Sequence, residues 1–592
     1  MNRAVSSVSI VSIALACSAL GLGGCTKKQD EVPKTFHFVA LSKIKTLDPV
    51  RSDDVYASVE VGHAYEGLLQ YHYLKRPLEL IPNLAESMPE VSADGRTITF
   101  KIKKGVLFQD DPCFKETGGK GRELVAEDFI YSWKRLADPK NLSPSWWILD
   151  GKVVGATEWH DEAVKAGVSD YSKPIEGLKA LDPYTLQIRL KQRTVQFLYN
   201  LAMDQMFVTP HEAVEMYGND FGTHAVGTGP FRLESYSQEK VIWRKNPTFR
   251  KELYPSEGEP GDKEAGLLAE AGQPLPRADR VITHVVEESQ PRWLGFLAGE
   301  FDFSDIPKDN YSTAIAPNKE LVPELKAKGI VLSKNYRLDV THTTFNLYDP
   351  LFAKNKLLRQ ALSLAFDSNR YIDLFYNGRA IPAQGPIPPG IAGYDPSLVN
   401  PYRQFNLAKA KELLAKAGYP EGKGLPTLEL LVPSTTTDRQ DAEFAEQMFA
   451  PLGVKTKIEM SSWPEFDKKM KDRKGHLWNF GWQADYPDAE NFLQLFYSKN
   501  VSPGPNDSSY SNPEYDALFE KALSLPDGPE RKAVHKKMVA MLMEDAPWIF
   551  NAHRIIYIVA QPWITGLKSS LLDHGRVKYI GVDLAKKAAR KK

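Results

Sequence analysis

The sequence predicts an α/β protein with more than one domain, and three observations support this fold class. The chain has 592 residues, which is enough for about three to four compact units. Strand patterns recur along its length and are separated by segments with a helical spacing of apolar residues. Between residues 408 and 482 strands and helices alternate closely, which is typical of a lobe with a largely parallel sheet.

The individual elements follow from local patterns. Strands are expected at 35–41, 97–102, 185–190, 427–432, 455–460 and 477–482. Helices are expected at 56–69, 126–137, 357–376, 408–417, 441–450 and 463–471. The segment 254–276 is rich in Pro and Gly and predicts an excursion on the surface. The basic run 585–592 predicts a solvated tail, with binding to anionic lipid as the alternative.

Residues 1–25 have the pattern of a lipoprotein signal. Arg3 precedes a short run of apolar and small residues at 8–22, which leads into Leu-Gly-Gly-Cys ending at Cys25. A basic start, a short apolar core and small residues before the cleavage point describe a secretory signal. The last four residues resemble the lipobox of bacterial lipoproteins, so Cys25 is the predicted lipidation site and its acyl chains would anchor the protein to a membrane. The alternative is a plain secretory signal with an incidental cysteine.

Composition and motif searches argue against several other classes of protein. Lys+Arg and Asp+Glu both total 75, so no net charge favours a nucleic-acid partner. No second run of about twenty apolar residues follows the signal, and no transmembrane helix is expected. Cys17 is expected to leave with the signal and Cys25 to carry the lipid. Cys113 then has no partner for a disulfide and is expected to be buried. Hydrolase, metalloprotease and phosphate-binding motifs are missing, so we expect no catalytic residue, metal or cofactor.

A series of motifs occurs in order along the mature chain. It includes LDP at 47–49, YEGL at 65–68, DGRTITF at 94–100, AEDFIYSWKR at 126–135, GTGPF at 227–231, RQAL at 359–362, WQADYPD at 482–488 and DAP at 545–547. Together these motifs resemble the extracellular solute-binding proteins of family 5, which serve oligopeptide and dipeptide ABC importers. The resemblance covers essentially the whole mature chain and is greatest to the oligopeptide-binding members.

The resemblance implies a two-lobed periplasmic-binding-protein fold of the large, cluster C type, with an extra inserted domain and a ligand cleft between the lobes. Lobe I is expected to comprise 26–66, 210–338 and 556–592, the inserted domain 67–209, and lobe II 339–555. The lobes would close around the ligand by a hinge motion. The protein would act as a monomer, anchored by lipid in the periplasm or on the extracytoplasmic face, and deliver peptide to a permease in the inner membrane.

The resemblance also assigns a ligand site. Asp485 corresponds to the residue that meets the α-ammonium of a bound peptide, and a carboxylate in an enclosed cleft suits a buried ammonium. Residues 481–484 correspond to a strand that pairs with the peptide backbone, and residues 53–55 to a matching strand from the other lobe. Trp463 corresponds to a pocket wall, although a core tryptophan is the alternative. The expected contact residues are Asp53, Val55, Trp463, Gly481, Trp482, Gln483, Ala484 and Asp485.

Two departures from the family pattern concern the same site. Some relatives have a Tyr after a Ser-Pro pair, where this chain has Ser145, with Trp146 or Trp147 as substitutes. Dipeptide-binding relatives have an Arg after the strand at 427–432; here Arg439 is out of register, so the residue that meets the ligand's C-terminus is not identified. The alternatives to a peptide receptor are a receptor for nickel, haem or an opine, an enzyme, or an envelope-assembly lipoprotein. Asp485 favours an amine-bearing ligand.

Overall fold

The computed structural model describes residues 32–76, 78–194, 196–525, 528–568, 572 and 575–590. The predicted lipidation site, Cys25, lies outside these residues. Every helix and strand named below belongs to the compact unit Lys34–Lys592. The predicted boundaries of lobe I, lobe II and the inserted domain stay predictions.

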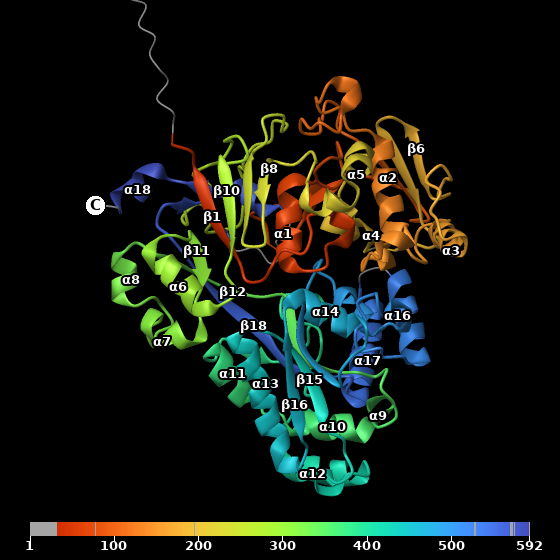
Figure 1. Cartoon of the computed structure of the whole chain (residues 1–592), viewed down its shortest axis with the longest axis vertical. Helices are drawn as coiled ribbons and strands as arrows, with labels where there is room; N and C mark the ends of the chain where they lie inside the picture. The colour runs from red at the N-terminus through yellow and green to blue at the C-terminus, as the bar shows by residue number, and fades with distance from the viewer. Residues whose placement is uncertain are drawn as a thin grey trace, which may run out of the picture. The chain divides into compact units, whose positions relative to one another are not determined.

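An eight-stranded sheet carries most of the C-terminal half of the chain. Its strands are ordered β11 (Phe303–Asp305), β18 (Trp548–Ala560), β13 (Asp339–Phe345), β17 (Leu477–Gln483), β15 (Leu428–Pro433) and β16 (Thr456–Ser461). Two further strands, β12 (Val331–Tyr336) and β14 (Ala380–Pro382), also pair with β18. The long β18 therefore changes partners along its length, from β13 and β14 at its start to β11 and β12 at its end (Figure 1).

The prediction of a largely parallel sheet is wrong. Only β15 pairs in parallel with its two neighbours, β16 and β17, whereas β13 pairs antiparallel with both β17 and β18. Parallel neighbours need a crossover connection. The helices α13 (Thr436–Phe449) and α14 (Trp463–Lys471) supply it for β15, β16 and β17. The strands β13 and β18 come from distant parts of the chain. A short helical crossover therefore does not set their direction, and they pair antiparallel.

Two smaller sheets lie in the N-terminal half. One has the order β1 (Thr35–Ala40), β10 (Arg280–Val285), β9 (Lys240–Lys245) and β8 (Phe231–Tyr236). The other has the order β4 (Glu90–Val91), β5 (Thr97–Lys101), β7 (Thr185–Arg189) and β6 (Leu178–Asp182). Short pairs join β2 (Leu69–Tyr71) with β3 (Leu80–Pro82) and β19 (Ile564–Thr565) with β20 (Gly581–Val582). All six predicted strands are confirmed to within a residue or two at each end.

The helices largely follow the sequence pattern. The longer ones are α1 (Val55–Ala64), α2 (Ala126–Ala137), α3 (Ala156–Ala166), α5 (His211–Tyr217), α6 (Ser289–Ala298), α12 (Leu407–Lys416), α16 (Pro513–Ser524) and α17 (Pro529–Asp545). The predicted helix at 357–376 is instead two helices, α10 (Lys356–Ala365) and α11 (Ser368–Tyr376). The break occurs because Asp367 caps α11 by accepting a hydrogen bond from the Arg370 N–H. The predicted helix at 441–450 begins earlier, at Thr436, where Thr435 caps it.

Two segments are mostly exposed, as predicted, but make specific contacts with the rest of the protein. The segment 254–276 consists mainly of turns, but Tyr254 is buried and Asp262 forms a 2.8 Å ion pair with Lys568. The basic tail contains helix α18 (Leu584–Ala589), where Lys587 pairs with the buried Asp302 at 3.3 Å. Both segments are therefore attached to the body of the protein at particular residues. Cys113 is buried, as predicted.

Candidate functional site

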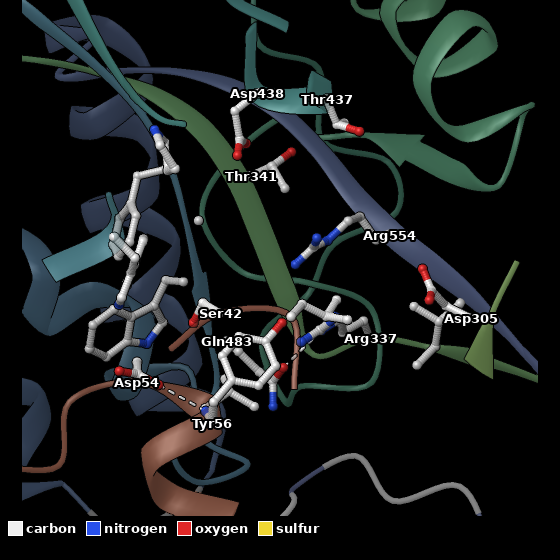
Figure 2. Close-up of a pocket in the computed structure, with 18 of the residues that line it drawn as sticks. Ser42, Asp54, Tyr56, Asp305, Arg337, Thr341, Thr437, Asp438, Gln483 and Arg554 are labelled. Carbon is white, nitrogen blue, oxygen red and sulfur yellow. Dashed lines mark hydrogen bonds between the residues drawn. The ribbon is translucent and has the colours of Figure 1, made fainter. Parts of the chain in front are cut away.

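A cavity of about 680 Å³ collects residues from segments that are far apart in the sequence. Its wall includes the segment before α1, the start of α14, the end of β17, the connection between β12 and β13, the start of α13 and the middle of β18. All eight predicted contact residues, Asp53, Val55, Trp463, Gly481, Trp482, Gln483, Ala484 and Asp485, line it. Figure 2 shows side chains from these segments facing the same space. The structure thus brings the predicted site residues together around one cavity.

The end of β17 presents an open backbone edge to this cavity. On one side β17 pairs with β13, with Val340 opposite Trp482 and Asp339 opposite Gln483. On its other side β17 pairs with β15 only at Leu477 and Trp478. Among the described residues, no strand pairs with this second edge from 479 to 483, and these residues line the cavity. An extended chain in the cavity can therefore continue the sheet by hydrogen bonding to β17.

Asp485 lies just beyond the end of β17, where Asn491 holds it in place. The Asn491 amide nitrogen donates to Asp485 Oδ2 at 2.8 Å, and Asn491 Oδ1 accepts from the Asp485 backbone N–H at 3.0 Å. The same oxygen accepts from Trp482 Nε1 at 3.0 Å. Asn491 is fully buried, in the short helix α15 (Glu490–Leu493). Sequence reasoning missed Asn491, because nothing in its spacing distinguishes it from a helix-start asparagine.

Asp488 has a different environment from Asp485. Its two carboxylate oxygens accept from Arg531 at 2.7 and 2.8 Å, and both side chains are buried. Such a bidentate ion pair fixes the orientation of both side chains, and both oxygens of Asp488 bind Arg531. Of these two carboxylates, only Asp485 lines the cavity.

Trp463 both lines the cavity and packs in an aromatic cluster, so it has features of the pocket wall and of the core tryptophan that the sequence allows. It begins α14, lines the cavity and is partly exposed. One side of its ring packs on Phe480, with centroids 5.8 Å apart, and on Phe466. The Nζ of Lys45 lies 5.6 Å from the ring centroid. Trp463 is therefore a cavity wall supported by an aromatic cluster.

The segment 53–55 is not the strand that the sequence predicts. Val55 is the first residue of α1, and Asp54 caps the helix by accepting from the N–H groups of Tyr56 and Ala57 at 2.9 and 3.0 Å. The backbone at Asp54, with φ −134° and ψ 159°, is extended. The Asp53 carboxylate forms a 2.5 Å ion pair with Lys45. The helix forms because an Asp before a run of helix-compatible residues satisfies the free N–H groups of the first turn.

The structure shows where the residues lie at which this sequence departs from the family pattern. Ser145 and Trp147 line the cavity, whereas the Trp146 ring stacks on His160 with centroids 4.6 Å apart. Of these two tryptophans, Trp147 is therefore the one that faces the site. Arg439 does not line the cavity; it is exposed on α13 and lies 3.8 Å from Glu443.

Arg337 and Arg554 are among the arginines that line the cavity, and sequence reasoning missed both. Arg337 Nε donates to Gln483 Oε1 at 2.8 Å and lies 3.3 Å from Asp339 Oδ2. Arg554 binds the same carboxylate oxygen through Nε at 2.7 Å and Nη2 at 2.6 Å. Burial alone would lower the pKa of Arg554, but the Asp339 carboxylate raises it further above its usual range. No local pattern marks these residues, because Asp339 brings them together across two strands.

Carboxyl groups at the start of α13 face the same space. Burial raises the pKa of Asp438 to about 6. Burial, with a further contribution from Asp438, raises the pKa of Asp441 to about 8. The Tyr371 hydroxyl donates to Asp441 Oδ2 at 3.1 Å. Asp441 is therefore mostly protonated near neutral pH.

The described residues contain no cluster of His, Cys, Asp and Glu side chains arranged to hold a metal ion. No described helix is long and apolar enough to cross a membrane.

The arrangement of sheets around a cavity with an open strand edge defines a solute-binding protein. Residues 79–504 match the family of bacterial extracellular solute-binding proteins, family 5, and the chain belongs to that family. It is 27% identical to heme-binding protein A of Haemophilus influenzae, over 88% of this chain and 87% of that protein. It is 28% identical to the glutathione-binding protein GsiB of Salmonella typhimurium, over 86% of each.

The fold is also that of solved structures. The periplasmic binding protein DppA from Helicobacter pylori, which is associated with an ABC transporter and was solved with the peptide STSA, superimposes with a TM-score of 0.75. The two chains are 26% identical, and the match covers 93% of this chain and 98% of DppA. The predicted family and α/β solute-binding fold are therefore confirmed.

Proposed function

We propose that this protein is an exported, lipid-anchored receptor that captures peptides in the cavity and delivers them to an ABC permease. The open edge of β17 carries the proposal. Backbone N–H and C=O groups at 479–483 match the repeating groups of an extended peptide, whatever its side chains. The lipid anchor rests on the Cys25 motif alone, and delivery to a permease on membership of the family.

The position of the Asp485 carboxylate also supports the proposal. This group lies beyond the last residue of β17, so a peptide paired with that edge can place its α-ammonium there. The Asn491 amide donates to this carboxylate at 2.8 Å and fixes its position. Trp463 and Trp482 add flat apolar surfaces that accept varied side chains.

Peptides fit this cavity better than the other cargoes considered. Two relatives are described as binding heme and glutathione, and the DppA structure holds a peptide. A ligand with an ammonium group would place a cation against the Asp485 carboxylate, which charged hydrogen bonding favours. Nickel lacks a ligand cluster among the described residues. A peptide, including a short or unusually linked one, satisfies both Asp485 and the β17 edge.

The test is direct measurement of peptide binding. The protein without its signal is incubated with di- to pentapeptides and examined by native mass spectrometry and isothermal titration calorimetry. We expect Asp485→Asn to weaken binding by about 2 kcal/mol, or about thirtyfold, because it removes one partner of an enclosed charge pair. Asp472→Asn is the control, because Asp472 is exposed, pairs with Lys468 and does not line the cavity.

Two results would contradict the proposal at different levels. If no peptide in the series binds, peptide capture is wrong. If peptides bind but Asp485→Asn has the same affinity as the unmodified protein, the ammonium role of Asp485 is wrong.

A further inference from the structure

We propose that Arg337 and Arg554 form a subsite that binds a carboxylate of the ligand, close to the ammonium site at Asp485. The inference rests on the proposed function and deepens it. It predicts that the cavity prefers peptides whose carboxylate lies within about three residues of the α-ammonium.

The fold places the two guanidinium groups side by side. Arg337 lies in the short connection between β12 and β13, and its backbone N–H donates to the Arg554 carbonyl oxygen at 2.9 Å. Arg554 lies where β18 changes partners, opposite Ala380 of β14. Figure 2 shows both side chains extending into the cavity, with Gln483 beside Arg337.

One buried carboxylate serves both arginines. Asp339 is fully buried and contacts Arg554 at 2.6 Å and Arg337 at 3.3 Å. A single carboxylate neutralises only one of two guanidinium groups, so the pair keeps a positive charge. Its side chains are 25% and 30% exposed, respectively, for Arg337 and Arg554, and both line the cavity.

The pair also has donors left for a ligand. A guanidinium has five N–H donors in a planar fork that matches a carboxylate. Among the described residues, none accepts from Nη1 or Nη2 of Arg337 or from Nη1 of Arg554. Among the described residues, neither Asp305, which pairs with Arg292 at 3.1 Å, nor Asp438, which accepts from the Thr435 hydroxyl at 2.6 Å, forms an ion pair with Arg337 or Arg554. Asp441, with its pKa raised to about 8 by burial, is mostly neutral at pH 7.

The sheet sets the spacing between the two charged subsites. Gln483 lies opposite Asp339 in register and binds Arg337 through its side chain, and Asp485 is two positions further along the chain. Neighbouring strands lie about 4.8 Å apart and each residue advances about 3.4 Å. Arg554 is two strands away from β17 and Asp485 is two residues beyond Gln483, so the Cα atoms of Arg554 and Asp485 are about 12 Å apart. That distance corresponds to about three residues of extended peptide.

The ligand's carboxylate has two chemical sources, its C-terminus and an acidic side chain, and matched peptides separate them. Ala-Ala-Ala is compared with its C-terminal amide, and Glu-Ala-Ala amide with Gln-Ala-Ala amide, by calorimetry. We expect the unmodified protein to bind the carboxylate member of at least one pair about tenfold more tightly, as is typical of charged hydrogen bonds. We expect Arg337→Gln and Arg554→Gln to bring that ratio close to one.

Arg439→Gln is the matched control, because Arg439 is exposed and outside the cavity, and it should leave the ratio unchanged. Loss of Arg554 removes the nearest partner of buried Asp339, so Arg337→Gln carries the test if Arg554→Gln does not fold. Equal binding of both members of both pairs, or unchanged ratios in the arginine variants, would overturn the subsite. If Asp485→Asn still weakens binding in that case, the proposed function stands; if none of the four peptides binds, both proposals are wrong.

Discussion

Asp485 and Asp488 are neighbours in the sequence, and the structure gives them different surroundings. Asp488 makes a bidentate ion pair with Arg531 inside the protein, whereas Asp485 lines the cavity and is positioned by Asn491. The motif around 482–488 indicates that a carboxylate contacts the ligand. The positions of Arg531 and Asn491 distinguish the two carboxylates, and those positions depend on α17 and α15.

Asp441 should make stability depend on pH. Its pKa is raised to about 8, chiefly by burial, whereas an unfolded Asp titrates near about 4. Between about pH 4 and pH 8 the folded state therefore holds a proton that the unfolded state releases. The free energy of unfolding falls as the pH rises through this range. Between pH 6 and 8 we expect the free energy of unfolding to fall by about 2 kcal/mol more in the unmodified protein than in Asp441→Asn.

Urea denaturation at pH 6, 7 and 8 measures this difference. Asn keeps an acceptor for the Tyr371 hydroxyl, so the variant removes the titrating proton with little change in packing. Parallel pH profiles for the two proteins would show that Asp441 is ionised in the folded state.

At the scale of elements, α1 shows how a cap helps to build the site. Asp54 accepts from the N–H groups of Tyr56 and Ala57, and this fixes the start of the helix beside the cavity. Asp53 and Tyr56, on either side of the cap, both line the cavity. The position of these side chains therefore depends on where α1 begins.

We expect Asp54→Ala to lower the free energy of unfolding by about 1 kcal/mol, which is typical of losing an N-cap. It should also weaken peptide binding, because the segment carrying Asp53 is no longer held. Asp54→Asn is the control, since Asn caps helices nearly as well as Asp. Chemical denaturation and calorimetry measure both effects. If the Ala and Asn variants are equally stable, the cap does not hold this segment.

The same scale shows where sequence patterns succeed and fail. The strands β15, β16 and β17 and the helices α12 and α14 follow from apolar spacing and end signals in the sequence. The break between α10 and α11 was missed because Asp367 lies within an unbroken apolar periodicity. The antiparallel pairing of β13 was also missed. One of its partners, β18, comes from the end of the chain.

At the scale of the whole molecule, Lys45 connects segments that are distant in the sequence. Its ammonium lies 2.5 Å from Asp53, 3.5 Å from Asp54 and 3.4 Å from Asp467 of α14. Burial alone would lower the pKa of Lys45, but these three carboxylates raise it above its usual range. Burial, and then the charge of Asp53, raises the pKa of Asp467. The three carboxylates therefore depend on Lys45 to remain together beside the cavity.

We expect Lys45→Met to increase the peptide dissociation rate by about tenfold, because it leaves three acidic groups facing one another across the cavity wall. The measurement is stopped-flow release of a fluorescent peptide. Lys468→Met is the control, because Lys468 is exposed on the same helix as Asp467 and pairs only with Asp472 among the described residues. An unchanged dissociation rate in Lys45→Met would mean that this ion-pair cluster does not retain the ligand.

The sequence by itself determined the family, most of the elements and eight of the residues that line the cavity. These features are encoded locally, in apolar periodicity, capping residues and short motifs. Only the tertiary structure decided which groups meet across the cavity: Asn491 with Asp485, Lys45 with Asp467, and Arg337 with Arg554 on Asp339. These contacts depend on strand register and on β18 pairing with segments far from it in the sequence, and local periodicity carries no information about either.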